Sequence, residues 1–390
     1  MRKIKIGLLT KIIIAILLGA ACGGFMPIGL QRTFATFNAL FGNFLGFFVP
    51  ILIVGLIVPG IAGVGRNAAR LLGITLGLAY LFTIVSGLYT WGVCEAIYPQ
   101  LLQGTTLPSS IMKGDTATPY FTIAMPPILD VMSALIVAFI IGIGITSLGE
   151  TPLKRIFEDL REIIMRTIAR VIIPLLPLYI FGIFLSISAN EQMASIMGLF
   201  MKLIVVIFAM TALLLILQFC VAGIVARRNP LKMLAHMMTA YVTALGTQSS
   251  AATIPVTLEQ TMRNGVRESI AGFVIPLCAT IHLSGSTLKI TACALAIMMV
   301  NGMTTEPATM VGFILMLGVT MVAAPGVPGG AIMAAIGILQ SILGFDQTAI
   351  GLMIALYIAM DSFGTATNVT GDGAIAVIID ALEKRTGNKR

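Results

Sequence analysis

Two carboxylates and two uncharged polar side chains share one face of a predicted helix near the carboxyl end of the chain. Asp361, Thr365, Asn368 and Asp372 follow one another at intervals of four, three and four residues, the repeat of one helix face. The surrounding residues are apolar, and buried carboxylates need cations beside them. An ammonium group and a bare metal ion are the natural candidates. The alternative, a helix end that reaches water, explains Asp372 in part but Asp361 poorly.

A second polar group, His282-Leu283-Ser284-Gly285-Ser286, interrupts another apolar run. Gly285 between two serines predicts an unwound turn whose carbonyl groups are free to act as ligands. Lys289 follows Ser286 by three residues and therefore lies on the same helix face. Because a lysine buried in lipid is costly unless it is paired, Lys289 either has a partner in the interior or extends toward the outer surface of the membrane.

Two further polar tips lie inside long apolar segments. Ser249 and Ser250 precede a predicted helix start, where free backbone N–H groups and the positive helix end can bind a carboxylate. The alternative for these serines is an ordinary helix cap. Residues 324–330, Ala-Pro-Gly-Val-Pro-Gly-Gly, contain two prolines and three glycines, which prevent a continuous helix. The alternative for this tip is a loop outside the membrane.

A membrane protein must position these groups. The chain has 390 residues, of which 58% are apolar and 10% charged, with a mean hydropathy of +1.02, whereas about a quarter of the residues in a soluble domain are charged. Backbone groups in lipid must pair within their own segment, so the fold is predicted to be all-α. Apolar runs of about 20 residues can cross the bilayer. We expect such spans at residues 6–28, 44–64, 71–98, 126–148, 171–190, 197–226, 268–300 and 349–380.

Residues 233–258 and 308–344 are too broken to be single spans. Each segment fits a helical hairpin that enters the membrane and returns to the same face. The placement of charges puts the entry of the first hairpin on the cytoplasmic side and that of the second on the outer side. With residues 268–300 and 349–380 the hairpins form an inverted repeat, which is the arrangement of many secondary transporters.

The basic residues indicate orientation rather than a ligand. The formal net charge is +8, and most of the 24 lysines and arginines fall in the two termini and in the loops that this topology places in the cytoplasm. We therefore expect a multi-pass protein of the inner (cytoplasmic) membrane with both termini cytoplasmic. Nucleic acid is not an expected partner, because these charges lie in short loops between spans. The five cysteines form no ligand-spaced cluster with histidine, so no zinc-type centre or disulfide framework is expected.

Four motifs in this order resemble those of the dicarboxylate/amino-acid:cation symporters, the glutamate-transporter-like sodium:dicarboxylate symporter family. They are Ser-Ser-x-x-Thr-x-Pro-Val-Thr from Ser249, Ala-Thr-Ile-x-x-x-Gly from Ala279, Gly-Val-Pro-Gly from Gly326 and Asn-Val-Thr-Gly-Asp from Asn368. The resemblance covers nearly the whole chain. It implies eight transmembrane helices plus two inverted re-entrant helical hairpins, a homotrimer in the lipid bilayer and an elevator-type movement. Residues 1–70 and 126–190 would be scaffold, residues 71–125 a transport-domain helix with an external loop, and residues 191–390 the transport core.

The resemblance also implies roles for single residues. Asp361 would hold the amino group of the substrate, with Thr365 and Asn368 as polar neighbours. The main carboxylate would bind at Ser249 and Ser250, and the outer lid would contain Gly326 and Val327. One sodium site would use Asp372, Asn368 and the carbonyls of Cys278 and His282, and a second would use the backbone carbonyls of Thr280, Met321, Val322 and Ala324. From the residue pattern itself we add Ser286 and Lys289 to the substrate-binding group.

Departures from the family pattern bear on substrate and coupling. Gly364 stands where the glutamate and aspartate carriers have an arginine that grips the side-chain carboxylate. An acidic substrate side chain would then be unpaired, at a cost of roughly several kcal/mol, unless Lys289 replaces the arginine. His282 and Ser284 replace an asparagine and an aspartate, and Ile84 replaces a serine, so a third sodium site is expected to be lost. His282 is a candidate to carry a proton instead, because imidazole titrates near neutrality.

We therefore expect a secondary active symporter, not an enzyme, that moves a small amino acid or carboxylate with Na⁺ (one or two sites) and/or H⁺ and has no covalent cofactor. A standard glutamate carrier is not expected because of Gly364. The alternative within this class is a C4-dicarboxylate or acidic amino-acid carrier with Lys289 as counter-charge. The alternative from another class is an ion channel, because re-entrant hairpins also build pores.

Overall fold

The computed structural model describes residues 8–62, 69–102, 118–189, 193–304, 306–324 and 329–387. Within these ranges the chain folds into helices and their connections and contains no strand, which confirms the predicted all-α class.

The amino-terminal half consists mainly of long helices. They are α1 (Leu8–Cys22), α2 (Ile28–Ala62), α3 (Ala69–Leu101), α5 (Val131–Leu148), α6 (Pro152–Thr167), the π-helical turn η2 (Ile168–Ile172), α7 (Ile173–Ala189) and α8 (Met193–Ala226). α2 packs along α5, and α1 packs along α7. α2 begins well before the span predicted at residues 44–64, because its first turns pack on protein: Phe37 stacks on Phe41, which contacts Tyr179 of α7.

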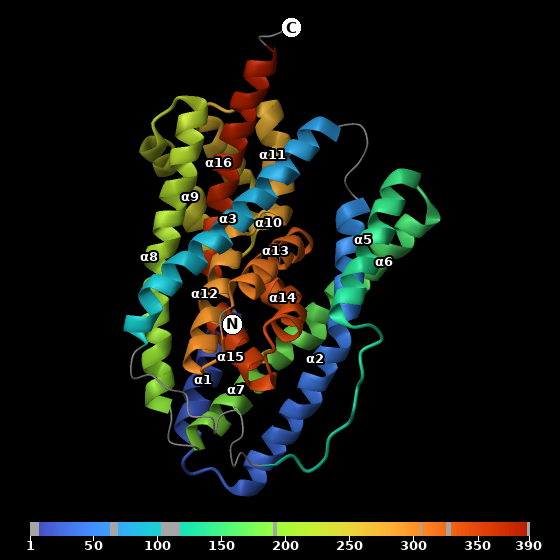
Figure 1. Ribbon diagram of the computed structural model, residues 1–390, viewed down its shortest axis with the longest axis vertical. Helices are drawn as coiled ribbons and strands as arrows, with labels where there is room; N and C mark the ends of the chain where they lie inside the picture. The colour runs from blue at the N-terminus through green and yellow to red at the C-terminus, as the bar shows by residue number, and fades with distance from the viewer. Residues whose placement is uncertain are drawn as a thin grey trace, which may run out of the picture.

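Four helix pairs make up the carboxyl-terminal half. They are α9 (Pro230–Thr247) with α10 (Ser250–Arg263), α11 (Glu268–Ile281) with α12 (Ser284–Val300), α13 (Pro307–Ala323) with α14 (Gly330–Ser341), and α15 (Gln347–Ala359) with α16 (Asp361–Gly387). The two segments predicted as hairpins are the pairs α9–α10 and α13–α14, and the members of each pair pack against each other. Figure 1 shows α16 running through this half, and it packs against α8 to α12.

Local backbone signals separate the members of these pairs. Gln248 ends α9 in the left-handed conformation (φ 54°), and the side chain of Ser249 accepts a hydrogen bond from the third residue after it to cap α10. His282 and Leu283 are non-helical and separate α11 from α12. The interruption predicted at the first place is therefore present. At the second, the helix is broken at His282 and Leu283, whereas Gly285, where the unwound turn was predicted, lies in the first turn of α12.

The last predicted span is divided into two helices. The sequence predicts one helix over residues 349–380, but α15 and α16 meet at Met360 with a bend of 63°. No proline or glycine marks this bend, so the apolar run gives no sign of it. The bend makes Asp361 the first residue of α16, where the positive end of the helix dipole favours a carboxylate.

Several described helices suit a membrane. Five are long and apolar enough to cross one (Ile28–Ala62, Leu71–Leu101, Pro152–Ser186, Gly198–Ala226 and Glu268–Val300), and counting the bent α15–α16 pair as one span gives six. α1, α5, α13 and α14 carry shorter apolar stretches. The chain is thus an α-helical membrane protein by composition and helix length, while the count of eight spans stays a prediction.

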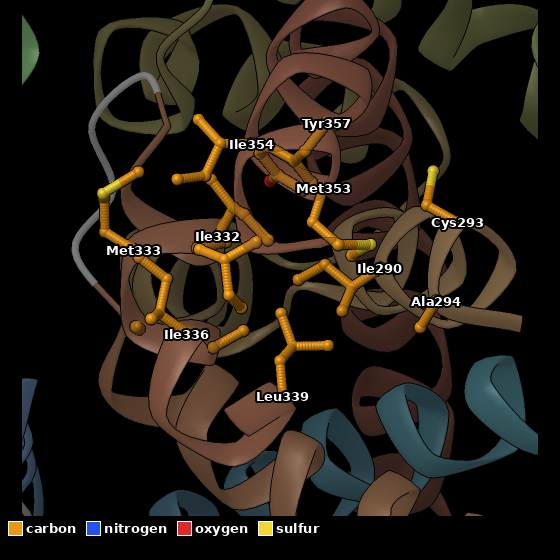
Figure 2. Close-up of a cluster of buried hydrophobic side chains, with 14 of the residues drawn as sticks. Ile290, Cys293, Ala294, Ile332, Met333, Ile336, Leu339, Met353, Ile354 and Tyr357 are labelled. Carbon is orange, nitrogen blue, oxygen red and sulfur yellow. The ribbon is translucent and has the colours of Figure 1, made fainter. Parts of the chain in front are cut away.

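A dense apolar core fixes α12, α14 and α15 relative to one another. Figure 2 shows Ile332, Ile336 and Leu339 of α14 gathered with Ile290 of α12 and Met353 of α15. These five side chains are at most 1% exposed. Because close-packed interiors transmit displacement rather than absorb it, these three helices hold one another in fixed positions.

Candidate functional site

Asp361 and Lys289 form a buried ion pair between α16 and α12. Lys289 Nζ lies 3.4 Å from Asp361 Oδ1, and the two side chains are 1% (lysine) and 9% (aspartate) exposed. The same Nζ donates to the Met360 carbonyl over 3.1 Å and lies 3.9 Å from the centre of the Tyr357 ring. Lys289 therefore has its partners in the interior, and the alternative in which it extends to the outer surface is wrong.

Gly364 provides the room for this lysine. A Cβ atom at Gly364 would lie 2.2 Å from Lys289 Cε and 2.3 Å from Nζ. The lysine thus occupies the space into which a side chain at position 364 would project. A cation on α12 therefore lies beside the position at which the resemblance implies an arginine in the glutamate and aspartate carriers.

Gly329 brings the second hairpin to the same carboxylate. Its N–H donates to Asp361 Oδ2 over 2.7 Å, and its positive φ of 73° suits a glycine. Both carboxylate oxygens of Asp361 therefore have protein partners. Gly326 and Val327, the predicted outer lid, lie outside the described residues.

Asn368 ties the start of α12 to α16. Its Oδ1 accepts hydrogen bonds from the N–H groups of Gly285 (2.8 Å) and Ser286 (3.3 Å), and its Nδ2 donates to Ser286 Oγ (3.1 Å). The Tyr357 hydroxyl donates to the same Ser286 Oγ over 2.9 Å. A Cβ atom at Gly285 would lie 2.7 Å from the Gly364 carbonyl oxygen, so the two helices meet at their backbones.

A second polar group lies further along α16. His282 Nδ1 and Asp372 Oδ1 are 2.9 Å apart, with both side chains at most 1% exposed. Gln218 of α8 donates to Ser284 Oγ (3.1 Å), and Ser86 of α3 donates to the Ser284 carbonyl (2.7 Å). The break between α11 and α12 is therefore bonded to α3, α8 and α16.

Three polar atoms of this group have no hydrogen-bond partner within the described part of the chain: Asp372 Oδ2, Gln218 Oε1 and His282 Nε2. A Cβ atom at Gly371 would lie 2.7 Å from both Gln218 Oε1 and His282 Cε1, so these side chains converge on one place beside α16. Buried oxygens without partners are costly. Carboxylate and amide oxygens are also the ligands that hard cations prefer, so this donor set fits a small cation such as Na⁺.

The other predicted ion ligands lie at the ends of α11 and α13, which pack against each other. Cys278 and Thr280 belong to the last turn of α11, and Met321, Val322 and Ala324 lie at the end of α13. Carbonyls at such ends lack helical partners and carry the negative end of the dipole. Two of them already accept bonds, Cys278 O from the N–H four residues later (2.9 Å) and Met321 O from the N–H three residues later (3.3 Å). Across the described ranges, no three His, Cys, Asp or Glu side chains cluster as metal ligands.

Ser249 and Ser250 lie at the tip of the first hairpin, between α9 and α10. Ser249 Oγ accepts from the Ala252 N–H over 3.3 Å, so its side chain acts as the helix cap that was the alternative prediction. Ser250 is 5% exposed. Within the described chain, no hydrogen bond joins either serine to the ion pair. Thr365 is buried (9% exposed) on α16, between Asp361 and Asn368 in the sequence.

Sequence reasoning missed Gln218, Ser86 and Tyr357. Gln218 is the one amide in the apolar 34-residue helix α8, and that isolation was a usable signal. Ser86 and Tyr357 gave no signal, because their partners lie 198 and 71 residues away in the chain.

Broken helices and helical hairpins beside buried charged groups are features of many secondary transporters. A sequence model of the sodium:dicarboxylate symporter family matches residues 8–382. The chain therefore belongs to this family, whose members are transporters and not enzymes, and the resemblance noted above is confirmed.

Individual relatives are similar over most or part of the chain. The serine/threonine transporter SstT of Acinetobacter baumannii (strain AYE) is 27% identical over 398 residues, which cover 98% of each protein. The SstT of Acinetobacter baylyi is 26% identical over 410 residues, again 98% of each. Excitatory amino acid transporter 1 of Rattus norvegicus is 32% identical over 259 residues, which cover 65% of this chain and 47% of the rat protein.

Proposed function

We propose that the protein is a symporter that couples Na⁺ to a small amino acid or carboxylate, bound among Asp361, Asn368 and the tips of the two hairpins. One observation carries this proposal: α16 holds Asp361, Asn368 and Asp372 in the interior beside the break between α11 and α12. Charged groups at this depth need counter-charges, and a co-transported cation and substrate ammonium supply them. The names of the relatives, a serine/threonine transporter and an excitatory amino acid transporter, support an amino acid as substrate.

The free oxygens of Asp372 and Gln218 are the proposed place for a coupling Na⁺, together with carbonyls at the end of α11. A second site would use the carbonyls at the end of α13. A proton is the second candidate for the coupling ion at the first site. His282 favours it, because its ring already bonds Asp372 and keeps one nitrogen without a partner among the described residues.

A C4-dicarboxylate or an acidic amino acid is the second candidate substrate. Lys289 favours it, because its ammonium lies over Gly364, where the family's arginine would project. In that case the lysine would pair with the second carboxylate of the substrate. Loss of L-aspartate uptake in Lys289→Ala would support this candidate, and uptake that survives the substitution would exclude it.

The movement that we propose is an elevator, in a homotrimer of the cytoplasmic membrane with both termini cytoplasmic. The bonds of Ser86 and Gln218 to Ser284 would let α3 and α8 travel with the transport core. α5, which packs on α2, exposes isoleucines along one face at 57% to 66% (Ile136, Ile140 and Ile143), as a surface against lipid or a neighbouring protomer would.

Reconstitution in liposomes tests the proposal. Labelled L-serine, L-alanine, L-aspartate and succinate are offered under separate sodium and proton gradients. We expect saturable uptake of at least one amino acid under the sodium gradient. If the proton is also coupled, His282→Gln removes the response to the proton gradient and leaves the response to sodium. A current without saturable uptake would identify an ion channel and refute the proposal.

A further inference from the structure

Lys289 has the contacts that a bound amino group would have. An ammonium carries three N–H donors. Lys289 Nζ faces the Asp361 carboxylate, the Met360 carbonyl and the Tyr357 ring, at 3.4, 3.1 and 3.9 Å. A carboxylate, a carbonyl and an aromatic face are together the usual surroundings of a bound ammonium. The lysine side chain is 1% exposed, so this environment belongs to the protein interior.

Asp361 offers no oxygen that is free of protein partners. Oδ2 accepts from Gly329 N–H at 2.7 Å, and Oδ1 faces Lys289. A substrate ammonium that binds between Asp361 Oδ1, the Met360 carbonyl and the Tyr357 ring must displace the lysine, which occupies that place. The contact with Lys289 is the longer, at 3.4 Å against 2.7 Å, and a flexible lysine side chain can move without the backbone, whereas the Gly329 N–H cannot. Displacement of the lysine is thus the easier of the two exchanges.

We propose that Lys289 is a tethered competitor for the amino group of the substrate at Asp361, and that it thereby sets the affinity of this carrier for amino acids. The inference rests on the proposed function, in which Asp361 receives that amino group. It assigns to Lys289 a role opposite to that of a counter-charge for a substrate carboxylate. A competitor weakens the binding of amines, whereas a counter-charge strengthens the binding of anions.

Gly364 leaves the space in which Lys289 lies beside Asp361. Because a Cβ atom there would lie 2.2 Å from Lys289 Cε, any side chain at this position pushes the lysine away from Asp361. Gly364→Ala therefore removes the competitor while it keeps the charge in the protein. Lys289→Met removes the charge and keeps most of the side-chain volume. The two variants should agree if competition is the role of the lysine.

The experiment compares ligands that differ only in the amino group. L-Aspartate and succinate form one such pair, and L-serine and 3-hydroxypropionate form another. Binding to the purified protein in sodium is measured for the wild type, Lys289→Met and Gly364→Ala. We expect both variants to bind the amino acids about tenfold to a hundredfold more tightly, which is the worth of one hydrogen bond to a charged group. The amine-free partner of each pair should change little.

Two controls match the substitutions. Lys202→Met removes an exposed lysine of α8, and Gly272→Ala adds a methyl group on α11 where nothing lies within 4 Å. Both should bind every ligand as the wild type does. Unchanged or weaker binding of amino acids in Lys289→Met would overturn the inference, and weaker binding of succinate as well would establish the counter-charge instead. If no ligand binds to any variant or to the wild type, the proposed function itself fails, and the inference fails with it.

Discussion

Replacing Asn368 with leucine should destabilise the contact between α12 and α16. Leucine has the same branched shape and number of side-chain heavy atoms as asparagine and is bulkier, but it accepts no hydrogen bond. The N–H groups of Gly285 and Ser286, now bonded to Asn368 Oδ1, would lose their acceptor in the interior. The Ser286 hydroxyl would keep its bond from Tyr357. The effect therefore comes from the two backbone donors.

The magnitude follows from those two donors. An unsatisfied buried donor costs about 1–3 kcal/mol, so two cost about 2–6 kcal/mol. This is a large part of a typical free energy of unfolding, which is about 5–15 kcal/mol. We expect Asn368→Leu to lower the thermal unfolding temperature of the purified protein in detergent by several degrees and to abolish uptake in liposomes.

Thr90→Val is the matched control. The Thr90 hydroxyl donates to the Ser86 carbonyl of its own helix over 2.7 Å, and its removal leaves no buried donor unpaired. This control should cost less than about 1 kcal/mol. If Asn368→Leu unfolded at the same temperature as Thr90→Val, the two backbone N–H groups would have other acceptors, and the reasoning about the α12–α16 contact would be refuted.

Three further predictions concern the ion site, the helix contact and the end of α16. Asp372→Asn keeps the shape of the side chain but removes its charge. The sodium concentration for half-maximal uptake should therefore rise about tenfold or more, because a tenfold change corresponds to about 1.4 kcal/mol of binding free energy. Gly285→Ala places a Cβ atom 2.6 and 2.7 Å from two atoms of α16, which should cost about 1–3 kcal/mol in thermal unfolding and slow uptake. Arg267→Ala removes a 2.6 Å ion pair with Asp380, which is 3% exposed. Because the ion pair between Asp380 and a lysine one turn later on α16 remains, the free energy of unfolding should fall by less than about 1 kcal/mol.

Each of these predictions has a contrary outcome. An unchanged sodium dependence in Asp372→Asn would show that the coupling ion binds elsewhere. Gly312→Ala has nothing within 4 Å of the added methyl group and serves as the control for Gly285→Ala. Equal uptake by these two alanine variants would contradict the close helix contact. A large loss of stability in Arg267→Ala would mean that the remaining lysine does not compensate.

Local signals in the sequence were sufficient for the tip of the first hairpin. Gln248 and Ser249 break and cap their helices through their own backbone and side chain, so neighbouring residues specify the turn. The bend at Met360 has no such signal, because packing of α15 against α12 and α14 determines it. Helix periodicity placed Asp361 and Asp372 on one face, but it could not show which groups they meet.

Contacts between distant segments account for the rest. Lys289 and Asp361 are 72 residues apart, and only the packing of α12 on α16 brings them together. The sequence shows that glycine stands at position 364, where the resemblance implies an arginine in the glutamate and aspartate carriers. It does not show that the Lys289 side chain fills the space beside this glycine. Gln218 reaches Ser284 from α8 across 66 residues, and no pattern within either segment predicts that bond.

In the movement proposed above, the hydrogen bond from the Gly329 N–H to Asp361 would couple displacement of the second hairpin to the charge of the interior. Lifting that hairpin withdraws a donor and leaves a carboxylate oxygen exposed in a medium of low polarity, where a bare charge is unfavourable. In the proposed transport cycle, water or another donor would have to take the place of the Gly329 N–H before the second hairpin could move away. This one hydrogen bond would therefore help to hold the hairpin in place.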